Sequence, residues 1–392
     1  MAGRLSQVEE SVTVRIADIV RETERQGEKV VKLQTGDPDF PTPDVIIEAA
    51  YAALKAGYTH YSDSRGLPEL REAIAAKLSR ENGLQYAPAR EILVTHGGVH
   101  AIFSTINALV GEGDEVLILD PCWMPYVSAT LIAGARPVRV PADPAGDFEP
   151  PVDKIEASLG PRTRLLILNS PCNPTGRVFG AEALDVIARI ARRHDLYVIA
   201  DEVYEKYVYH GHRHISLASL AGMKERTITV NSLSKSYAMT GWRVGYLAAP
   251  ADLVDRILKV SQYSVTNIAP FVQKAAVVAL TSPAAESAAA RMREVFAQRH
   301  ERITRELSAV EGVRAVAPQG AFYFLVDVSR LNPDSVAFAT QFLREQRVAV
   351  VPGVGFGQCA EGFFRMTFAA PEDQILEGIA RLRRLAQAAL RR

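Results

Sequence analysis

Short apolar segments alternate with amphipathic segments through the first two thirds of the chain. The apolar segments have the length and composition of buried strands, and they cover residues 92–95, 115–119, 165–168, 197–200, 227–230 and 244–248. Helical periodicity lies between them, for example over residues 181–194. Strands that alternate with helices predict an α/β fold, in which helices cover both faces of a mostly parallel sheet.

The last part of the chain has a different pattern. A helical segment at 285–307 is followed by short strand patterns at 312–316, 322–328, 348–351 and 363–368. This order predicts a smaller α+β domain, and we expect the segment up to about Phe40 to pack with it. The predicted large domain therefore covers residues 42–284, and both chain ends, 1–41 and 285–392, form the small domain.

Polar clusters follow four of the predicted strands. His96-Gly97-Gly98 follows the first, and a loop rich in Asn, Pro and Gly at 169–176 follows the third. Residues 201–204 and 231–235 follow the next two. Because ligands bind at the carboxyl ends of parallel strands, we expect these clusters to gather along one edge of the sheet.

Charge and composition narrow the possible partners. Lys and Arg total 45, as do Asp and Glu, so the formal net charge is zero. A neutral chain gives no indication of a nucleic acid or anionic membrane partner. We expect no signal peptide and no transmembrane helix, because long apolar runs are missing. The three scattered cysteines fit reduced thiols, so we expect a cytoplasmic protein.

Lys235 and Asp201 are candidates for chemistry on an aromatic cofactor. A lysine in a partly apolar site loses its proton more easily and attacks a carbonyl to form a Schiff base. Asp201 closes an apolar strand, where a protonated pyridine nitrogen would be a suitable partner. Tyr204 could reach the same ring. Taken singly, Lys235 and Asp201 are better explained as a surface lysine and a strand-end cap, and Tyr204 is at least as well explained as a half-buried tyrosine.

Other residues are candidates for binding anions. Gly97 and Gly98 open a helical pattern, so their backbone N–H groups and the helix dipole favour a phosphate, which Ser232 and Arg243 could also bind. Trp123 could stack on a pyridine ring, although core packing is the alternative. Arg365 lies inside an apolar strand pattern and therefore needs a carboxylate, from the protein or a substrate.

Together these residues resemble the class I aminotransferases of pyridoxal 5′-phosphate (PLP) fold type I, the aspartate aminotransferase superfamily. The matching strings are residues 36–40, 169–176 and 232–235 with 240–243, together with Arg365. The resemblance runs from about residue 10 to the end of the chain. It implies a large domain with a mostly parallel seven-stranded sheet flanked by helices, and a smaller α+β domain.

The resemblance also implies PLP as the cofactor and a role for each matching residue. The catalytic residues would be Lys235, as the PLP-binding lysine and proton carrier, Asp201 and Tyr204. PLP would be bound by Lys235, Gly98, Val99, Trp123, Asn173, Asp201, Tyr204, Ser232, Ser234 and Arg243. Tyr61 of the partner subunit in a homodimer would reach the phosphate. The substrate would be bound by Gly36, Trp123, Asn173 and Arg365, and no metal is expected.

The implied reaction moves the α-amino group of an L-amino acid to a 2-oxo acid by a ping-pong mechanism. Close bacterial aspartate aminotransferases have a lysine where this chain has Val99, and residues 261–270 contain no arginine. We therefore expect a neutral, aromatic or basic side chain to be favoured over aspartate. Arg65 and Asp63 could touch the far end of the substrate.

Other functions remain as alternatives at this point. A PLP enzyme of this fold could instead be a carbon–sulfur β-lyase, a cyclase or an oxidase, because fold does not fix the reaction. A nucleotide-binding dehydrogenase is disfavoured, since no Gly-x-Gly-x-x-Gly follows the first strand. A PLP-sensing transcription regulator would need an added DNA-binding domain, for which we expect no room before the matching region.

Two further motifs are expected to be structural. His210, His212 and His214 lie in a glycine-containing connection, where a surface turn is favoured over a metal site. The glycine-rich residues 351–357 follow a late strand pattern. We interpret them as a turn that shapes the small domain near Arg365, not as a dinucleotide loop.

Overall fold

A seven-stranded sheet forms the centre of the computed structural model, which describes residues 5–8 and 12–391. The strand order is β2-β8-β7-β6-β5-β3-β4, and only β8 runs antiparallel to its neighbours. The mostly parallel α/β sheet is therefore confirmed. The strands are β2 (Ile92–Thr95), β3 (Glu115–Asp120), β4 (Arg136–Pro141), β5 (Thr163–Asn169), β6 (Tyr197–Asp201), β7 (Thr227–Ser232) and β8 (Gly245–Ala248).

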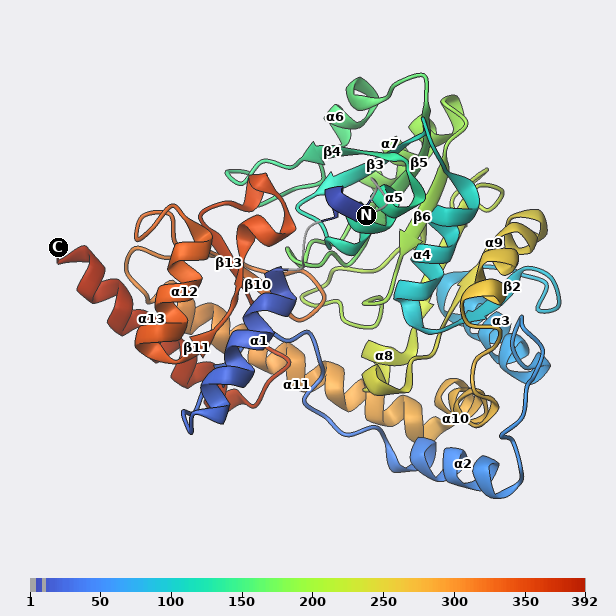
Figure 1. Ribbon diagram of the computed structural model, residues 1–392, viewed down its shortest axis with the longest axis horizontal. Helices are drawn as coiled ribbons and strands as arrows, with labels where there is room; N and C mark the ends of the chain where they lie inside the picture. The colour runs from blue at the N-terminus through green and yellow to red at the C-terminus, as the bar shows by residue number, and fades with distance from the viewer. Residues whose placement is uncertain (1–4, 9–11, 392) are drawn as a thin grey trace.

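Both faces of the inner strands, such as β5 and β6, are buried, and these strands are mainly apolar. In β5, Leu165 and Ile167 pack toward one helical layer, while Leu166 and Leu168 pack toward the other. Figure 1 shows the helices around the sheet. They are α2 (Asp44–Lys55), α3 (Pro68–Asn82), α4 (Gly97–Leu109), α5 (Pro125–Ala133), α6 (Val152–Ile155), α7 (Ala181–Arg193), α8 (Leu233–Ser236), α9 (Ala251–Ser264) and α10 (Pro270–Thr281).

A second, four-stranded antiparallel sheet has the order β12-β13-β10-β9. Its strands are β9 (Arg314–Val316), β10 (Tyr323–Asp327), β12 (Val351–Pro352) and β13 (Phe363–Thr367). The helices that pack around it are α1 (Val12–Arg25), α11 (Pro283–Ser308), α12 (Ser335–Gln346) and α13 (Glu372–Leu390). In Figure 1, the long helix α11 runs from α10 toward α12 and α13.

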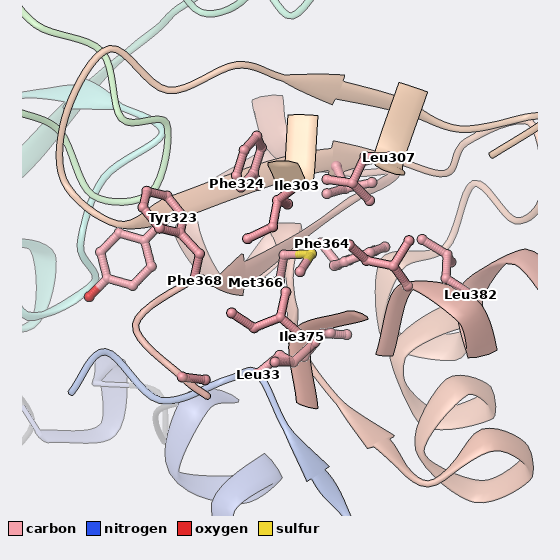
Figure 2. Close-up of a cluster of buried hydrophobic side chains, with 14 of the residues drawn as sticks. Leu33, Ile303, Leu307, Tyr323, Phe324, Phe364, Met366, Phe368, Ile375 and Leu382 are labelled. Atoms are coloured by element: carbon pink, nitrogen blue, oxygen red, sulfur yellow. The ribbon is translucent and has the colours of Figure 1, made fainter. Parts of the chain in front are cut away.

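The described part of the N-terminal segment contacts this second unit. Strand β1 (Val31–Lys32) pairs in parallel with β11 (Val348–Ala349). Figure 2 shows Leu33 within the same buried cluster as side chains from α11, β10, β13 and α13. The division into domains at residues 42 and 284 stays a prediction.

Short 3₁₀ helices complete the described elements. They are η1 (Leu5–Gln7), η2 (Glu156–Ser158), η3 (Leu217–Ser219), η4 (Thr240–Trp242), η5 (Gly353–Phe356) and η6 (Gln358–Ala360). The glycine-rich segment 351–357 contains β12 and η5, and its Phe356 ring lies beside Arg365. No helix among the described residues is both long and apolar enough to span a membrane.

Candidate active site

A hollow of about 450 Å³ opens where the carboxyl ends of β5, β6 and β7 meet the start of α4. Its walls come from segments far apart in the sequence, including strands of the seven-stranded sheet and of the four-stranded sheet. Most of the predicted site residues line it, whereas Tyr61, Gly97, Asp63 and Arg65 do not. The lining residues are Gly36, Gly98, Val99, Trp123, Asn173, Asp201, Tyr204, Ser232, Ser234, Lys235, Arg243 and Arg365.

Lys235 presents a buried amine to this hollow from the short helix α8. Its Nζ donates a hydrogen bond to the Gly36 carbonyl at 2.5 Å, and the Tyr207 hydroxyl donates to the Lys235 carbonyl at 2.8 Å. Burial lowers the pKa of Lys235 from 10.5 to about 8, against the opposing charge of Asp37. A substantial fraction of the amine is therefore neutral, and nucleophilic, near pH 8.

This pKa predicts a distinct pH dependence of chemical labelling. In the cofactor-free protein, acetylation of Lys235 by acetic anhydride is expected to rise with a midpoint near pH 8. Lys274 is the internal control, because its hydrogen bond from Nζ to Glu69 raises its pKa above 10.5. Peptide mass spectrometry across a pH series measures both. Equal midpoints for the two lysines would contradict the assigned environment of Lys235.

Asp201 is a buried acid without a cationic side-chain partner among the described residues. The Tyr126 hydroxyl donates to its Oδ2 at 2.5 Å, and the Val203 N–H donates to Oδ1 at 3.3 Å. Burial raises the pKa of Asp201 to about 6, although the bond from Tyr126 opposes the rise. A cation placed in the hollow would therefore stabilise the ionised carboxylate.

The start of α4 forms a site with several donors for an anion. Gly97 has φ +77°, a left-handed backbone conformation that favours glycine, and a Cβ there would lie 2.6 Å from Nη2 at the flexible end of Arg243. Arg243 donates to the Thr240 carbonyl at 2.8 Å. The Ser232 and Ser234 hydroxyls, 2.9 Å apart, lie beside the same helix start. Helix N–H groups, two hydroxyls and a guanidinium suit a phosphate.

Arg365 is a buried cation without a carboxylate partner among the described residues. It donates to Oδ1 of Asn173 and to the Gln34 carbonyl, both at 2.8 Å, while its buried Nε has no partner. The rings of Tyr323 and Phe356 lie 4.3 and 4.9 Å from the guanidinium carbon. Burial lowers its pKa, so a bound carboxylate would offset the unpaired charge.

Comparison with known proteins identifies the family. Residues 28–382 match the family model described as aminotransferase class I and II. The chain belongs to this family. It is 40% identical to an aspartate aminotransferase of Pyrococcus abyssi and 38% identical to an aromatic-amino-acid aminotransferase of Thermococcus litoralis, over 98% of each chain. A crystal structure of an aromatic aminotransferase from Pyrococcus horikoshii superposes with a TM-score of 0.90 at 41% identity, over 94% of this chain and 99% of that one.

The chain is thus an aminotransferase, and its cofactor is PLP. The residues of the hollow fit this cofactor in three respects. The anion site suits its phosphate, Asp201 suits a protonated pyridine nitrogen, and Lys235 offers a buried amine for its aldehyde.

Three aromatic residues of the site were not predicted from the sequence. Tyr126 binds Asp201, and Tyr323 and Phe356 flank Arg365. The Tyr204 and Tyr323 hydroxyls lie 2.9 Å apart, and Figure 2 shows the Tyr323 hydroxyl pointing away from the apolar cluster. Tyr126 lies three residues after Trp123, at the start of α5, which is the one sequence signal that could have indicated it.

The residues around Tyr61 lie outside this hollow within a single chain. Tyr61 is 88% exposed, so its predicted contact requires a partner subunit. Arg65 pairs with Asp255, and Asp63 pairs with Arg71 at 3.3 Å. The suggestion that Arg65 and Asp63 touch the substrate therefore has no support from the hollow of this chain.

The three histidines of the segment 210–214 do not converge on a metal site. His210 bonds to His300 at 2.8 Å, while His212 is exposed. His214 lies 3.1 Å from Glu202, and with Glu205 these residues place three possible ligand atoms within 4.8 Å. The Lys77 ammonium already binds Glu205, so it supplies the positive charge that this acidic group needs.

Proposed function

We propose that this aminotransferase moves the α-amino group of an L-amino acid with a neutral, aromatic or basic side chain to a 2-oxo acid by a ping-pong mechanism. The observation that supports it best is the convergence on one hollow of three ionisable groups that have no ion-pair partner among the described residues. These are the amine of Lys235, the acid of Asp201 and the guanidinium of Arg365. An amino acid and PLP together provide a partner for each.

Arg365 fixes one end of the substrate in this proposal. Its guanidinium, oriented by Asn173 and the Gln34 carbonyl, binds the α-carboxylate, with the Gly36 backbone beside it. The rings of Tyr323 and Phe356 hold the guanidinium plane in place and exclude water. A fixed carboxylate sets the direction of the bond from Cα to its hydrogen.

Lys235 acts as the base that removes the α-proton, in its neutral form, and later returns a proton. Asp201, oriented by Tyr126, would hold the pyridine nitrogen in its protonated form, and Tyr204 and Asn173 would bind the ring oxygen. Trp123 would cover the ring, while Gly98, Val99, Ser232, Ser234 and Arg243 surround the phosphate. PLP, when bound, supplies the ring that withdraws electrons from Cα.

The charges in the hollow argue against aspartate as the preferred donor. The cations that line it are Lys235, Arg243 and Arg365, and each already has a role. Val99, 45% exposed, offers no charge to a second carboxylate. The relatives include an aspartate aminotransferase and an aromatic-amino-acid aminotransferase at similar sequence identity. Identity alone therefore does not choose between these substrates, and the residues of the site must.

A single-turnover screen tests the proposed function. The purified PLP-loaded enzyme is mixed with one amino acid at a time, and its visible absorption is followed as the cofactor takes up the amino group. We expect conversion with neutral or aromatic donors, release of one oxo acid per site, and restoration by a 2-oxo acid. Ammonia release or oxygen uptake without an amino group stored on the cofactor would contradict transamination. A wide preference for aspartate would contradict the proposed range of donors.

A homodimer is the second part of the proposal. Ile47, Tyr51 and Leu54 lie on one face of α2 and are 44%, 64% and 41% exposed, and Tyr61 follows them. An apolar stripe of this kind on an enzyme surface is typical of a subunit interface. We propose that it binds a second copy, which brings Tyr61 to the partner's phosphate site. The cytoplasmic location stays a prediction.

Tyr51→Asp is expected to weaken this dimer at least tenfold, because a charge would be buried in an apolar contact. Sedimentation equilibrium measures the dissociation constant. Glu301→Ala, at an exposed position on α11, is the control and should leave the constant unchanged. A monomeric parent protein, or equal constants for parent and Tyr51→Asp, would refute the interface.

A further inference from the structure

A second hollow of about 490 Å³ adjoins the active site. The two hollows adjoin each other, because they share six lining residues: Val99, Ile102, Trp123, Met124, Pro125 and Gly355. The second hollow, which we call the annex, extends from this shared wall along α4 and α5, where Phe103, Ser128 and Ile132 line it.

The walls of the annex are mainly apolar and carry no carboxylate among the described residues. Its apolar lining residues include Phe103, Ala129 and Ile132 and the shared residues Ile102 and Met124. A cationic side chain would therefore lose its hydration without gaining a counter-ion. An apolar side chain, by contrast, would be stabilised in the annex, because its apolar surface would move from water into contact with apolar walls.

Arg139 is the charged residue that lines the annex, and its charge is already compensated. Its Nε lies 2.6 Å from Oδ2 of Asp120, and its Nη2 donates to Oδ1 of the same carboxylate at 2.9 Å. Nη2 also donates to the Phe356 carbonyl at 2.9 Å. A guanidinium held in this way offers little net charge to an acidic side chain and no counter-ion to a basic one.

We propose that the annex receives the substrate's side chain and that the preferred donors are amino acids with large, uncharged, mainly apolar side chains, aromatic ones above all. The inference rests on the proposed function, since Arg365 must hold the α-carboxylate at the other end of the space. It narrows that function, because it removes basic donors from the range. Small donors react but leave the annex unfilled.

The substitution Ser128→Phe tests the annex, because Ser128 lines it without lining the active-site hollow. In the parent enzyme, kcat/KM for phenylalanine should exceed that for alanine and for lysine at least tenfold, given about 10–200-fold per methylene in an apolar pocket. Ser128→Phe should lower the phenylalanine-to-alanine ratio at least tenfold. Ser128→Ala, the matched control, keeps the space and should retain the ratio.

Binding of unreactive acids separates this inference from the proposed function. Calorimetry with the PLP-loaded enzyme compares 3-phenylpropanoate with propanoate, and the phenyl compound should bind at least tenfold tighter, an advantage lost in Ser128→Phe. That result without transamination of any amino acid would refute the proposed function and keep the annex. Transamination with a preference for lysine, or with a ratio unaffected by Ser128→Phe, would overturn the annex and leave the proposed function standing.

Discussion

Replacing Lys235 with alanine is expected to lower kcat for amino-group transfer at least about 10⁴-fold, since one residue serves as nucleophile and as base. Lys235 is the one lysine that lines the active-site hollow, so no neighbouring amine among the described residues can take over. Stopped-flow absorption with a good donor measures the loss in the first half-reaction. Borohydride treatment of the PLP-loaded protein should no longer attach the cofactor to this peptide.

The matched control for this prediction is Lys274→Ala. Lys274 pairs with Glu69 away from the hollow, and its loss should change kcat less than about twofold. Added methylamine should restore part of the activity of Lys235→Ala, because it supplies the missing base. A kcat for Lys235→Ala within a hundredfold of the parent would exclude Lys235 as the base.

The pattern of apolar residues was sufficient to predict most of the central sheet. Strands such as β5, buried on both faces, produce continuous apolar runs with no other simple interpretation. Strand β4 was missed because it lies at the edge of the sheet, where Arg136 and Arg139 interrupt the apolar pattern. The predicted strand at 348–351 proved to be two, because Val348 and Val351 pair with different sheets.

The site could be predicted where strand order alone brings residues together. Asp201 and Lys235 follow parallel neighbouring strands, so the sheet itself places them at one edge. Tyr323 and Phe356 reach Arg365 only through the packing of the second sheet, which leaves no local signal in the sequence. His214 looked like part of a surface turn because its partners, Glu202 and Glu205, become close only when the loop after β6 folds back.

That loop is held by a buried ion pair behind the active site. Lys77 of α3 is 2% exposed, and its ammonium binds the side chains of Glu205 and Asn82. Burial alone would raise the pKa of Glu205, but the charges of Lys77 and His214, together with the hydrogen bonds from Asn82 and Lys77, outweigh it and lower the pKa to about 2. Glu205 follows Tyr204 directly, so the pair helps to fix the position of that hydroxyl.

Lys77→Met is expected to lower the free energy of unfolding by about 3–5 kcal/mol, because it leaves Glu205 as a buried, uncompensated charge. Urea unfolding at fixed protein concentration measures this loss. The control is Arg80→Met, which removes an exposed ion pair with Glu81 on the same helix and should lower the free energy of unfolding by at most about 1 kcal/mol.

The double variant Lys77→Met/Glu205→Met should recover most of the loss, since neither charge then remains. Because the folded pKa of Glu205 lies below its ordinary 4.5, the parent should lose this contribution as pH falls from about 4.5 toward 2, while Glu205→Met should show a shallower loss there. If Lys77→Met and Arg80→Met prove equally stable, the pair does not hold the loop. The position of Tyr204 must then depend on its contacts with Phe322 and Tyr323 instead.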